Sequence, residues 1–274
     1  MADTMLQHGH ALPGAALASD RMPGHWLLAR LGKRVLRPGG RELTDRLLAA
    51  LAIGPGDDVV ELAPGLGATT ELVLARDPAS YVGVDRDPAA SARVARISAG
   101  PRRSVIQASA AETGLPDGCA DVAFGEAYLT MQPASQKERI LTELARIVRP
   151  GGRIGIHEIA LRPDDLDPAV RGRITADLTG EIKVHVSPLT VAEWSALLDG
   201  AGFDVRVRER APLHLLEPRR LVADEGWLGA IRFMGRVAVR RDARRRVLAM
   251  RSVMRRHGEH LEACAMVATR RSPS

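Results

Sequence analysis

The stretch from Asp58 to Thr70 constrains the fold of this chain more than any other. It reads DVVELAPGLGATT: a short apolar run that ends in a carboxylate, then a glycine-rich turn, then the start of a helix. An apolar run of this length is typical of a buried parallel strand. Glycines allow the backbone of the turn to approach a bound molecule closely, and the free N–H groups of a helix start attract polar groups. The stretch therefore predicts a strand–turn–helix cofactor site.

The same alternation of strand and helix continues along the chain. We expect seven strands, over residues 59–62, 81–85, 104–107, 120–124, 153–158, 203–210 and 260–269. Helices are expected between the first five of them, over residues 67–76, 88–98 and 133–148. Repeated strand–helix units with nearly continuous apolar strands predict an α/β fold, in which a Rossmann-like, mostly parallel seven-stranded sheet carries helices on both faces.

Further helices flank this core. Two helices, over residues 24–36 and 41–53, precede the first strand and are expected to form a lid over the site. Residues 1–22 are expected to form a loosely ordered tail, in which His8 and His10 do not make a metal site. A helix near 191–198 and two Arg-rich helices within 212–257 lie before the last strand.

We interpret the chain as one domain with three parts. Residues 1–53 form the tail and lid, 54–160 the cofactor-binding core, and 161–274 the C-terminal part, whose helical insertion shapes specificity for the substrate. A chain of 274 residues, 45% of them hydrophobic, is long enough for one large α/β domain.

Composition also narrows the class of protein. The two cysteines, Cys119 and Cys264, lie far apart and predict neither a disulfide framework nor a zinc site. The first residues lack the pattern of a signal peptide, and no apolar run is long enough to cross a bilayer. We therefore expect a cytoplasmic protein.

A net charge of +6 raises the question of an anionic partner, because ten arginines lie between residues 232 and 256. Three interpretations stay open for this segment: a solvated helix face, an anionic substrate or lipid surface, and nucleic acid. Nucleic acid is the least favoured, because the basic residues are not interleaved with aromatic side chains for base stacking.

The glycine turn alone does not identify the cofactor. A nicotinamide site wants G-x-G-x-x-G, but Gly65 and Gly67 are followed by Thr70 where the third glycine would fall. The Gly-Lys-Ser/Thr ending of a P-loop is absent. A dehydrogenase is thus a distant alternative.

Four motifs in order resemble those of the class I S-adenosylmethionine-dependent methyltransferases, in particular their small-molecule branch. They are Glu61–Gly67, Asp85 at the end of the second strand, the segment 115–122 before the fourth strand, and the helix and Pro-Gly-Gly turn over 144–153. The resemblance covers roughly residues 40–160. It implies S-adenosyl-L-methionine as cofactor and methyl transfer as the reaction.

The resemblance, together with the chemistry of the cofactor, assigns residues to cofactor binding. The Gly65–Gly67 backbone can approach the methionine end, and Asp85 can accept bonds from both ribose hydroxyls; the alternative for Asp85 is a helix N-cap. Ala63 stands where the family often has Gly, and Ser109 where it often has an Asp that contacts adenine. The expected cofactor contacts are Glu61, Ala63, Gly65, Gly67, Thr70, Asp85, Arg86, Ser109, Ala110 and Glu126.

Open α/β sheets bind ligands beyond the carboxyl ends of their strands, which places Glu126 and His157 near the transferred methyl. Glu126 is the first candidate for a catalytic base or a group that binds a cationic acceptor; the alternatives are a ligand of the cofactor's amino group or a helix cap. His157 is the second candidate base, with a structural histidine as its alternative. Tyr128, Met131 and Gln132 are expected to line the acceptor pocket.

We therefore expect a methyltransferase that acts on a small-molecule acceptor by in-line displacement. The alternatives are an RNA methyltransferase and a non-catalytic S-adenosylmethionine-binding regulatory protein. No metal site and no transmembrane segment are expected, and nucleic acid is disfavoured as a partner. The acceptor, its reacting atom and the oligomeric state stay open.

Overall fold

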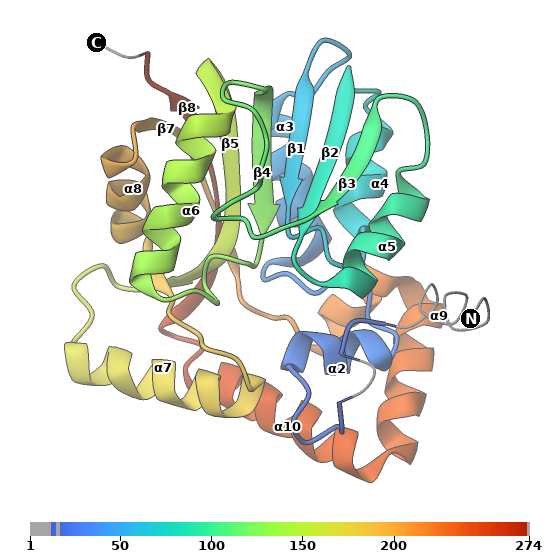
Figure 1. Cartoon of the computed structure of the whole chain (residues 1–274). Coiled ribbons are helices and arrows are strands. Elements are labelled where there is room, and N and C mark those ends of the chain that lie inside the picture. The colour runs from blue at the N-terminus through green and yellow to red at the C-terminus, as the bar shows by residue number, and fades with distance from the viewer. Residues whose placement is uncertain (1–11, 15–16, 273–274) are drawn as a thin grey trace.

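The computed structural model describes residues 12–14 and 17–272, so His8 and His10 lie outside the described residues. Its centre is one mixed sheet of eight strands (Figure 1). The strands are β1 (Asp58–Leu62), β2 (Ser80–Asp85), β3 (Arg103–Gln107), β4 (Ala120–Glu126), β5 (Val148–Leu161), β6 (Leu189–Thr190), β7 (Phe203–Pro212) and β8 (Leu261–Arg270). Their order is β3-β2-β1-β4-β5-β8-β7, and β6 pairs with β5.

The predicted α/β class and mostly parallel sheet are confirmed, but the count of seven strands is one too low. The missed strand, β6, has only two residues, which is too short to produce a periodic pattern. Strand β8 runs antiparallel to both β5 and β7, whereas the other pairs are parallel. Strand β5 is also longer than predicted at both ends: it continues to Leu161, which pairs with β8, and begins at Val148, which pairs with Ala120 of β4.

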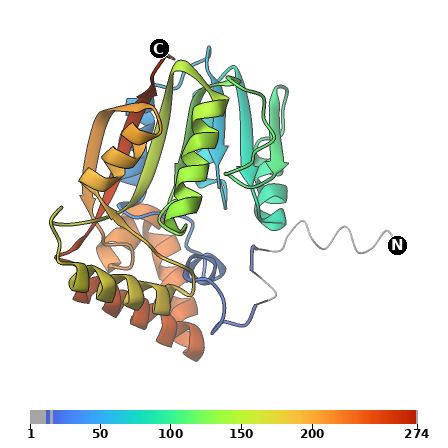
Figure 2. The same ribbon diagram turned by 60° about the vertical axis from the view of Figure 1, so that its left-hand side comes forward.

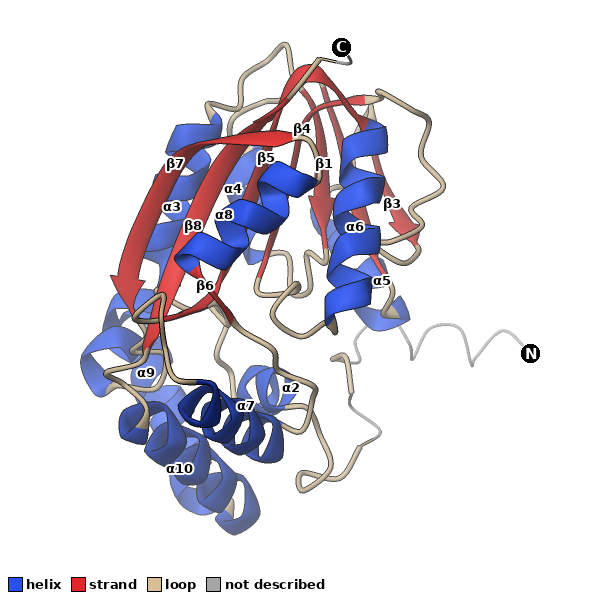
Figure 3. Ribbon diagram, turned by 90° about the vertical axis from the view of Figure 1, so that its left-hand side faces the viewer, coloured by secondary structure: helices blue, strands red, loops and turns tan. Residues whose placement is uncertain are grey.

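Helices cover both faces of the sheet. They are α2 (Gly24–Arg30), α3 (Gly40–Leu51), α4 (Ala68–Leu74), α5 (Pro88–Ile97), α6 (Ala134–Ile147), α7 (Pro168–Ile182), α8 (Val191–Gly200), α9 (Pro218–Val239) and α10 (Arg241–Arg256). On one face α6 and α8 pack against the sheet, and α3, α4 and α5 pack on the other (Figure 3). The remaining helices, α2, α7, α9 and α10, form a layer beyond the carboxyl ends of the parallel strands (Figures 1 and 2).

The two helices before β1 do not share one role. Helix α3 packs on the sheet face, because its leucines lie on one side and bury against β5 and β8. Gly155 of β5 makes room for them: a Cβ there would lie 2.9 Å from Leu51 Cδ1 and 3.1 Å from Leu47 Cδ1. Helix α2, which ends at Arg30 and not at Leu36, packs against α7 and α10 beyond the strand ends. Of the two helices, only α2 occupies the position expected of a lid.

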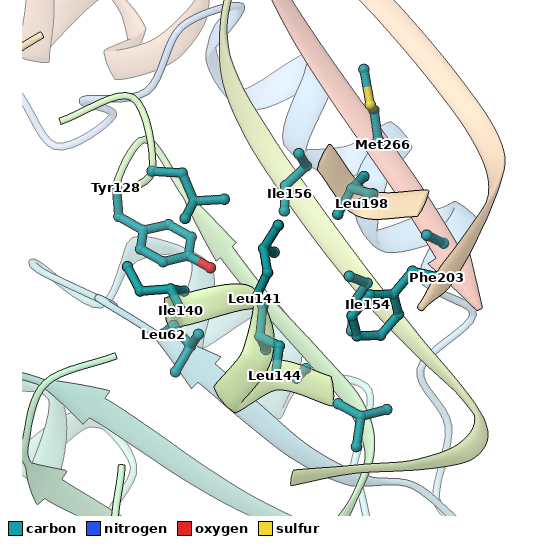
Figure 4. Close-up of a cluster of buried hydrophobic side chains, with 14 of the residues drawn as sticks. Leu62, Tyr128, Ile140, Leu141, Leu144, Ile154, Ile156, Leu198, Phe203 and Met266 are labelled. Carbon is teal, nitrogen blue, oxygen red and sulfur yellow. The ribbon is translucent and has the colours of Figure 1, made fainter. Parts of the chain in front are cut away.

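The core between the sheet and α6 positions the segment that follows β4. Tyr128 inserts its ring among Leu62, Ile140 and their neighbours (Figure 4). The ring fits closely over Gly125, where a Cβ would lie 2.5 Å from Tyr128 Cε1. This packing fixes the start of the β4–α6 connection, which borders the carboxyl end of the sheet.

A buried carboxylate holds the same connection in place. Glu158 of β5 accepts hydrogen bonds from the N–H groups of Tyr128 (3.1 Å), Leu129 (2.8 Å) and Thr130 (2.9 Å). The Thr130 hydroxyl donates a fourth, at 2.6 Å. Burial raises the pKa of Glu158, while these four bonds favour its charged form. Strand β5 thus anchors the loop that follows its neighbour β4.

We expect Glu158→Gln to lower the free energy of unfolding by about 2–4 kcal/mol. The amide replaces an acceptor oxygen by an NH₂ group, which would face backbone N–H donors in a buried site. Chemical denaturation monitored by circular dichroism measures the change. Glu259→Gln, at an exposed position, is the matched control and should change stability by less than about 0.5 kcal/mol. Equal stability of the two variants would contradict the anchoring role.

Candidate active site

A cavity of about 570 Å³ opens at the carboxyl ends of the parallel strands, under helix α2. Its lining brings together eleven of the fourteen residues that the sequence predicts for the site. These are Glu61, Ala63, Gly65, Asp85, Arg86, Ser109, Ala110, Glu126, Tyr128, Met131 and Gln132. The three others, Gly67, Thr70 and His157, lie behind this lining.

The turn after β1 has a left-handed backbone at three positions: Ala63 (φ 52°), Gly65 (φ 56°) and Gly67 (φ 76°). Gly65 borders the cavity and lies below Trp26 of α2, whose Cη2 would be 3.7 Å from a Cβ on Gly65. Gly67 instead backs onto α5, where a Cβ would lie 2.5 Å from Ile97 Cδ1. A left-handed non-glycine residue costs about 1–2 kcal/mol, which explains why the resemblance favours Gly where this chain has Ala63.

Glu61 is buried at the end of β1 and faces the cavity. Its Oε2 accepts hydrogen bonds from the hydroxyls of Tyr81 (2.6 Å) and Thr70 (2.7 Å). Thr70 therefore orients Glu61 and does not line the cavity itself. Burial raises the pKa of Glu61 to about 7, although the Tyr81 and Thr70 bonds oppose the rise. The carboxyl group is consequently poised to change charge near neutral pH.

Asp85 lies at the end of β2 with both carboxylate oxygens held by backbone. The N–H of Gly65 donates to Oδ2 (3.0 Å) and the N–H of Asp87 to Oδ1 (2.9 Å). Burial raises the pKa of Asp85, and these two bonds lower it. Helix α5 is capped by Asp87, whose side chain accepts from Ala89 and Ala90, so the N-cap alternative for Asp85 is wrong. The remaining lone pairs of Asp85 are available to a ligand in the cavity.

Glu126, the last residue of β4, is the centre of a buried charge cluster. Its Oε1 accepts from the Thr44 hydroxyl (2.5 Å) and contacts His157 Nδ1 (2.7 Å). Its Oε2 accepts from the Thr69 hydroxyl and lies 3.4 Å from Arg37 Nε. Burial alone would raise the pKa of Glu126, but Arg37 and His157 outweigh it and bring the pKa to about 2. Glu126 is therefore a carboxylate throughout the neutral range.

His157 lies behind Glu126 and is fully buried. Its Nδ1 faces the Glu126 carboxylate, and its Nε2 faces the carbonyl oxygen of Pro38. Both partners are acceptors, so the ring satisfies both contacts only when each nitrogen carries a proton. This geometry suits a cation that links β5 to the segment before α3.

Sequence reasoning missed three members of this cluster: Arg37, Thr44 and Thr69. Arg37 stands in an Arg-Pro-Gly-Gly sequence that indicates only a turn. Thr69 is adjacent to Thr70 at the start of α4, and the sequence gives no signal for which hydroxyl turns toward β1 and which toward β4. Thr44 follows the helical repeat of α3 as a buried position, and only the fold shows that it reaches Glu126.

The lid side of the cavity carries two aromatic rings that sequence reasoning also left out. His25 and Trp26 of α2 line the cavity with their ring centroids 4.5 Å apart. Burial lowers the pKa of His25 to about 4, and Arg86 adds to the effect, so its ring is neutral. Among the described residues, no group forms a hydrogen bond with the buried Nδ1 of His25. A ligand in the cavity can provide the missing partner.

The parallel strands, the glycine turn and the acid after β2 together define a Rossmann-like protein that binds an adenosine-type cofactor. A model of the methyltransferase domain family matches residues 59–152. A Haemophilus influenzae protein named only as uncharacterized is 32% identical over 223 residues, which is 80% of this chain and 86% of that one.

Two further proteins that resemble this chain have names that state a function. A Mycobacterium demethylmenaquinone methyltransferase is 36% identical over 114 residues, 41% of this chain and 46% of that enzyme, so the match spans less than half of its length. The structure of Haemonchus contortus phosphoethanolamine N-methyltransferase 2 with S-adenosyl-L-methionine superposes with a TM-score of 0.67 at 12% identity, covering 91% of this chain and 57% of that one. The chain belongs to the class I S-adenosylmethionine-dependent methyltransferases, and its cofactor is S-adenosylmethionine.

The residues of the cavity fit this cofactor. Gly65 borders the cavity without a Cβ and so admits a close backbone approach, and the unpaired Nδ1 of His25 offers a polar contact on the lid side. Glu61 and Glu126 place two carboxyl groups on the wall that borders β1 and β4. Such a wall suits a cofactor that carries an ammonium and a sulfonium charge.

We expect the affinity for S-adenosylmethionine to rise with pH as Glu61 ionises. Below a pKa of about 7 the carboxyl group must first release its proton, which costs up to tenfold in Kd for each pH unit. The same raised pKa lowers the free energy of unfolding of the ligand-free protein as the pH rises from about 4.5 to 7. In this range the folded protein retains a proton that the unfolded chain has released.

Calorimetric titrations from pH 5.5 to 8 in buffers of different ionisation enthalpy measure both the affinity and the protons released. Glu61→Gln should flatten the pH dependence and abolish the proton release, whereas Glu138→Gln, on the exposed side of α6, should change neither. A wild-type affinity that is constant over this range would contradict the role of Glu61.

Proposed function

We propose that this protein transfers a methyl group from S-adenosylmethionine to a small acceptor with an apolar body. The observation that carries the proposal is the composition of the cavity beyond the cofactor residues. That part is lined by aliphatic and thioether side chains from α6, α7, α10 and the segments beside them: Ile140, Ile159, Ile182, Val184, Val186, Leu213, Leu215, Met250 and Met254. An apolar compartment next to a few polar groups is typical of sites for small molecules.

In this proposal, different residues of the cavity hold different parts of the cofactor. Gly65 and Asp85 hold the methionine and ribose ends, and Ser109 with the Ala110 N–H holds the adenine. Bound S-adenosylmethionine supplies an electrophilic methyl group on a sulfonium. Helix α2 covers the cavity with His25 and Trp26 and restricts the access of water. Alignment of donor and acceptor in such a site provides ~7–11 kcal/mol of the barrier reduction.

Glu126 acts in this proposal as a fixed negative charge and not as a base. A carboxyl group with a pKa of about 2, held by two hydroxyls and two cationic groups, has little capacity to accept a proton. His157 serves as a positioning residue, because it contacts Glu126 and does not line the cavity. The acceptor side of the site retains Tyr128, Met131 and Gln132, and His185 also lines the cavity.

The same lining disfavours RNA as the acceptor. Recognition of single-stranded bases relies on aromatic stacking platforms in a basic channel, whereas this compartment is mainly aliphatic. The name of the mycobacterial relatives gives demethylmenaquinone as their acceptor, which supports a small molecule here as well.

Transfer of label from methyl-labelled S-adenosylmethionine tests the proposal. We expect labelled product in a small-molecule extract that is partitioned into organic solvent, and none in purified RNA. Label that accumulates in RNA would overturn the small-molecule assignment. Binding of the cofactor with no labelled product from any extract would favour the regulatory alternative.

Glu126→Gln tests the fixed-charge role. Loss of the anion leaves Arg37 and His157 buried without their partner and facing a cationic cofactor, so we expect the Kd for S-adenosylmethionine to rise at least tenfold. Unfolding measurements should accompany the titration, because removal of one partner of a buried ion pair costs about 3–5 kcal/mol. Glu138→Gln again provides the exposed control. An acidic limb in the pH–rate profile that disappears in Glu126→Gln but persists in Glu61→Gln would show that Glu126 is a base after all.

A further inference from the structure

Helix α9 carries an exposed apolar surface that the methyl-transfer site does not use. We call this surface the α9 face; it consists of Trp227 (73% exposed), Leu228 (71%), Ile231 (63%), Met234 (53%) and Val239 (79%). Large apolar side chains that gather on one exposed helix face mark an interaction surface. No helix among the described residues is long and apolar enough to cross a membrane.

The backbone explains how this face is displayed. Gly226 has a non-helical conformation (φ 71°, ψ 167°), which breaks α9 into two parts and starts a new helical segment at Trp227. At the helical repeat of about 3.6 residues per turn, the five residues of the α9 face lie on one continuous arc of this second segment. The opposite side of the segment is already occupied, because Ala230 and Phe233 are buried in a cluster with the leucines of α2. The α9 face is thus oriented away from the protein.

The charged side chains on the second segment of α9 are all of one sign. Between residues 226 and 241 the chain has four arginines, at 232, 236, 240 and 241, and no acidic residue. In the described part of the chain, neither Arg232 nor Arg240 lies within ion-pair distance of a carboxylate. Both are exposed and free to contact an external anion.

We propose that the α9 face docks onto the surface of an anionic lipid bilayer. An exposed arc with a tryptophan, aliphatic side chains and flanking arginines matches the requirements of an interfacial helix. The apolar side chains enter the boundary between headgroups and acyl chains, and the arginines pair with anionic headgroups. A second copy of the chain fits less well, because two copies of the face would bring their unpaired arginines together.

The position of α9 connects this surface to the cavity. The buried side of α9 shares a hydrophobic cluster with α2 and α10, and Arg236 donates a hydrogen bond to the carbonyl of Leu31 at the end of α2. Helix α2 in turn provides His25 and Trp26 to the cavity wall. A protein docked through the α9 face would therefore hold its lid helix directly above the lipid surface.

Sedimentation with vesicles tests the proposal on the full chain. We expect binding to vesicles with 30% phosphatidylglycerol in phosphatidylcholine, at least tenfold weaker binding to pure phosphatidylcholine, and weaker binding at high salt. Fluorescence of Trp227 should shift to the blue, because this exposed indole leaves water. Wild-type protein that ignores both types of vesicle would overturn the proposal.

Matched variants separate the face from general charge. Leu228→Glu with Ile231→Glu adds two negative charges and should weaken binding to anionic vesicles at least tenfold. Arg232→Gln with Arg240→Gln removes two positive charges and should have the same effect. Arg206→Glu, on the exposed edge strand β7, also changes the net charge by two and should leave binding within about twofold. Unaltered binding of the Leu228→Glu, Ile231→Glu variant would refute the assignment.

Two further measurements identify other outcomes. Analytical ultracentrifugation that shows a wild-type dimer, abolished in the same variant and without vesicle binding, would assign the face to self-association and overturn the lipid proposal. Calorimetry with S-adenosylmethionine should give wild-type affinity in all of these variants. A failure of vesicle binding is therefore distinguishable from a failure of the methyl-transfer proposal.

Discussion

The site depends on one buried charge, the carboxylate of Glu126. Its partners come from four separate parts of the chain: Arg37 from the segment before α3, Thr44 from α3, Thr69 from α4 and His157 from β5. A carboxylate removed from water is costly unless cations and donors surround it, so this group forces these elements to meet at one point. The cluster closes the floor of the cavity and fixes the position of the glycine turn above it.

Two carboxyl groups of the same type behave differently in this cavity because their surroundings differ. Glu126 has two cationic partners and a pKa of about 2, whereas Glu61 has only the hydroxyls of Thr70 and Tyr81 and a pKa of about 7. Glu126 is therefore always ionised near neutral pH, whereas Glu61 can lose its proton when a cation binds beside it. This division matches a cofactor whose positive groups lie at two points.

Much of the fold could be predicted from the sequence, because strands such as β1 and β4 are short apolar runs followed by turn signals, and β7 alternates apolar and polar residues. The two-residue β6 gives no such signal, and the separate roles of α2 and α3 depend on packing. The leucines of α3 predict a buried face but not what buries it; the sheet competes successfully for that face because Gly155 leaves space for Leu47 and Leu51. For the site, the residues that border the cavity follow the order of the strands. The groups that tune them, Arg37, Thr44 and Thr69, come from contacts between distant segments, which no local pattern encodes.

The net charge of +6 hides an uneven distribution of charge, with an acidic cavity wall and a basic outer surface. Carboxyl groups border the cofactor end of the cavity, whereas much of the arginine excess lies on α9 and α10, where most arginines are exposed. An interior that attracts a cationic cofactor and an exterior that attracts anions do not interfere, because most arginines of α9 and α10 are exposed to solvent and surface charges are screened over about 8–10 Å. The arginines of the C-terminal helices therefore need no role in methyl transfer. Only those beside the apolar arc of α9, such as Arg232, belong to the proposed lipid contact, whereas Arg246 and Arg251 of α10 bind carbonyl or carboxylate oxygens of this chain.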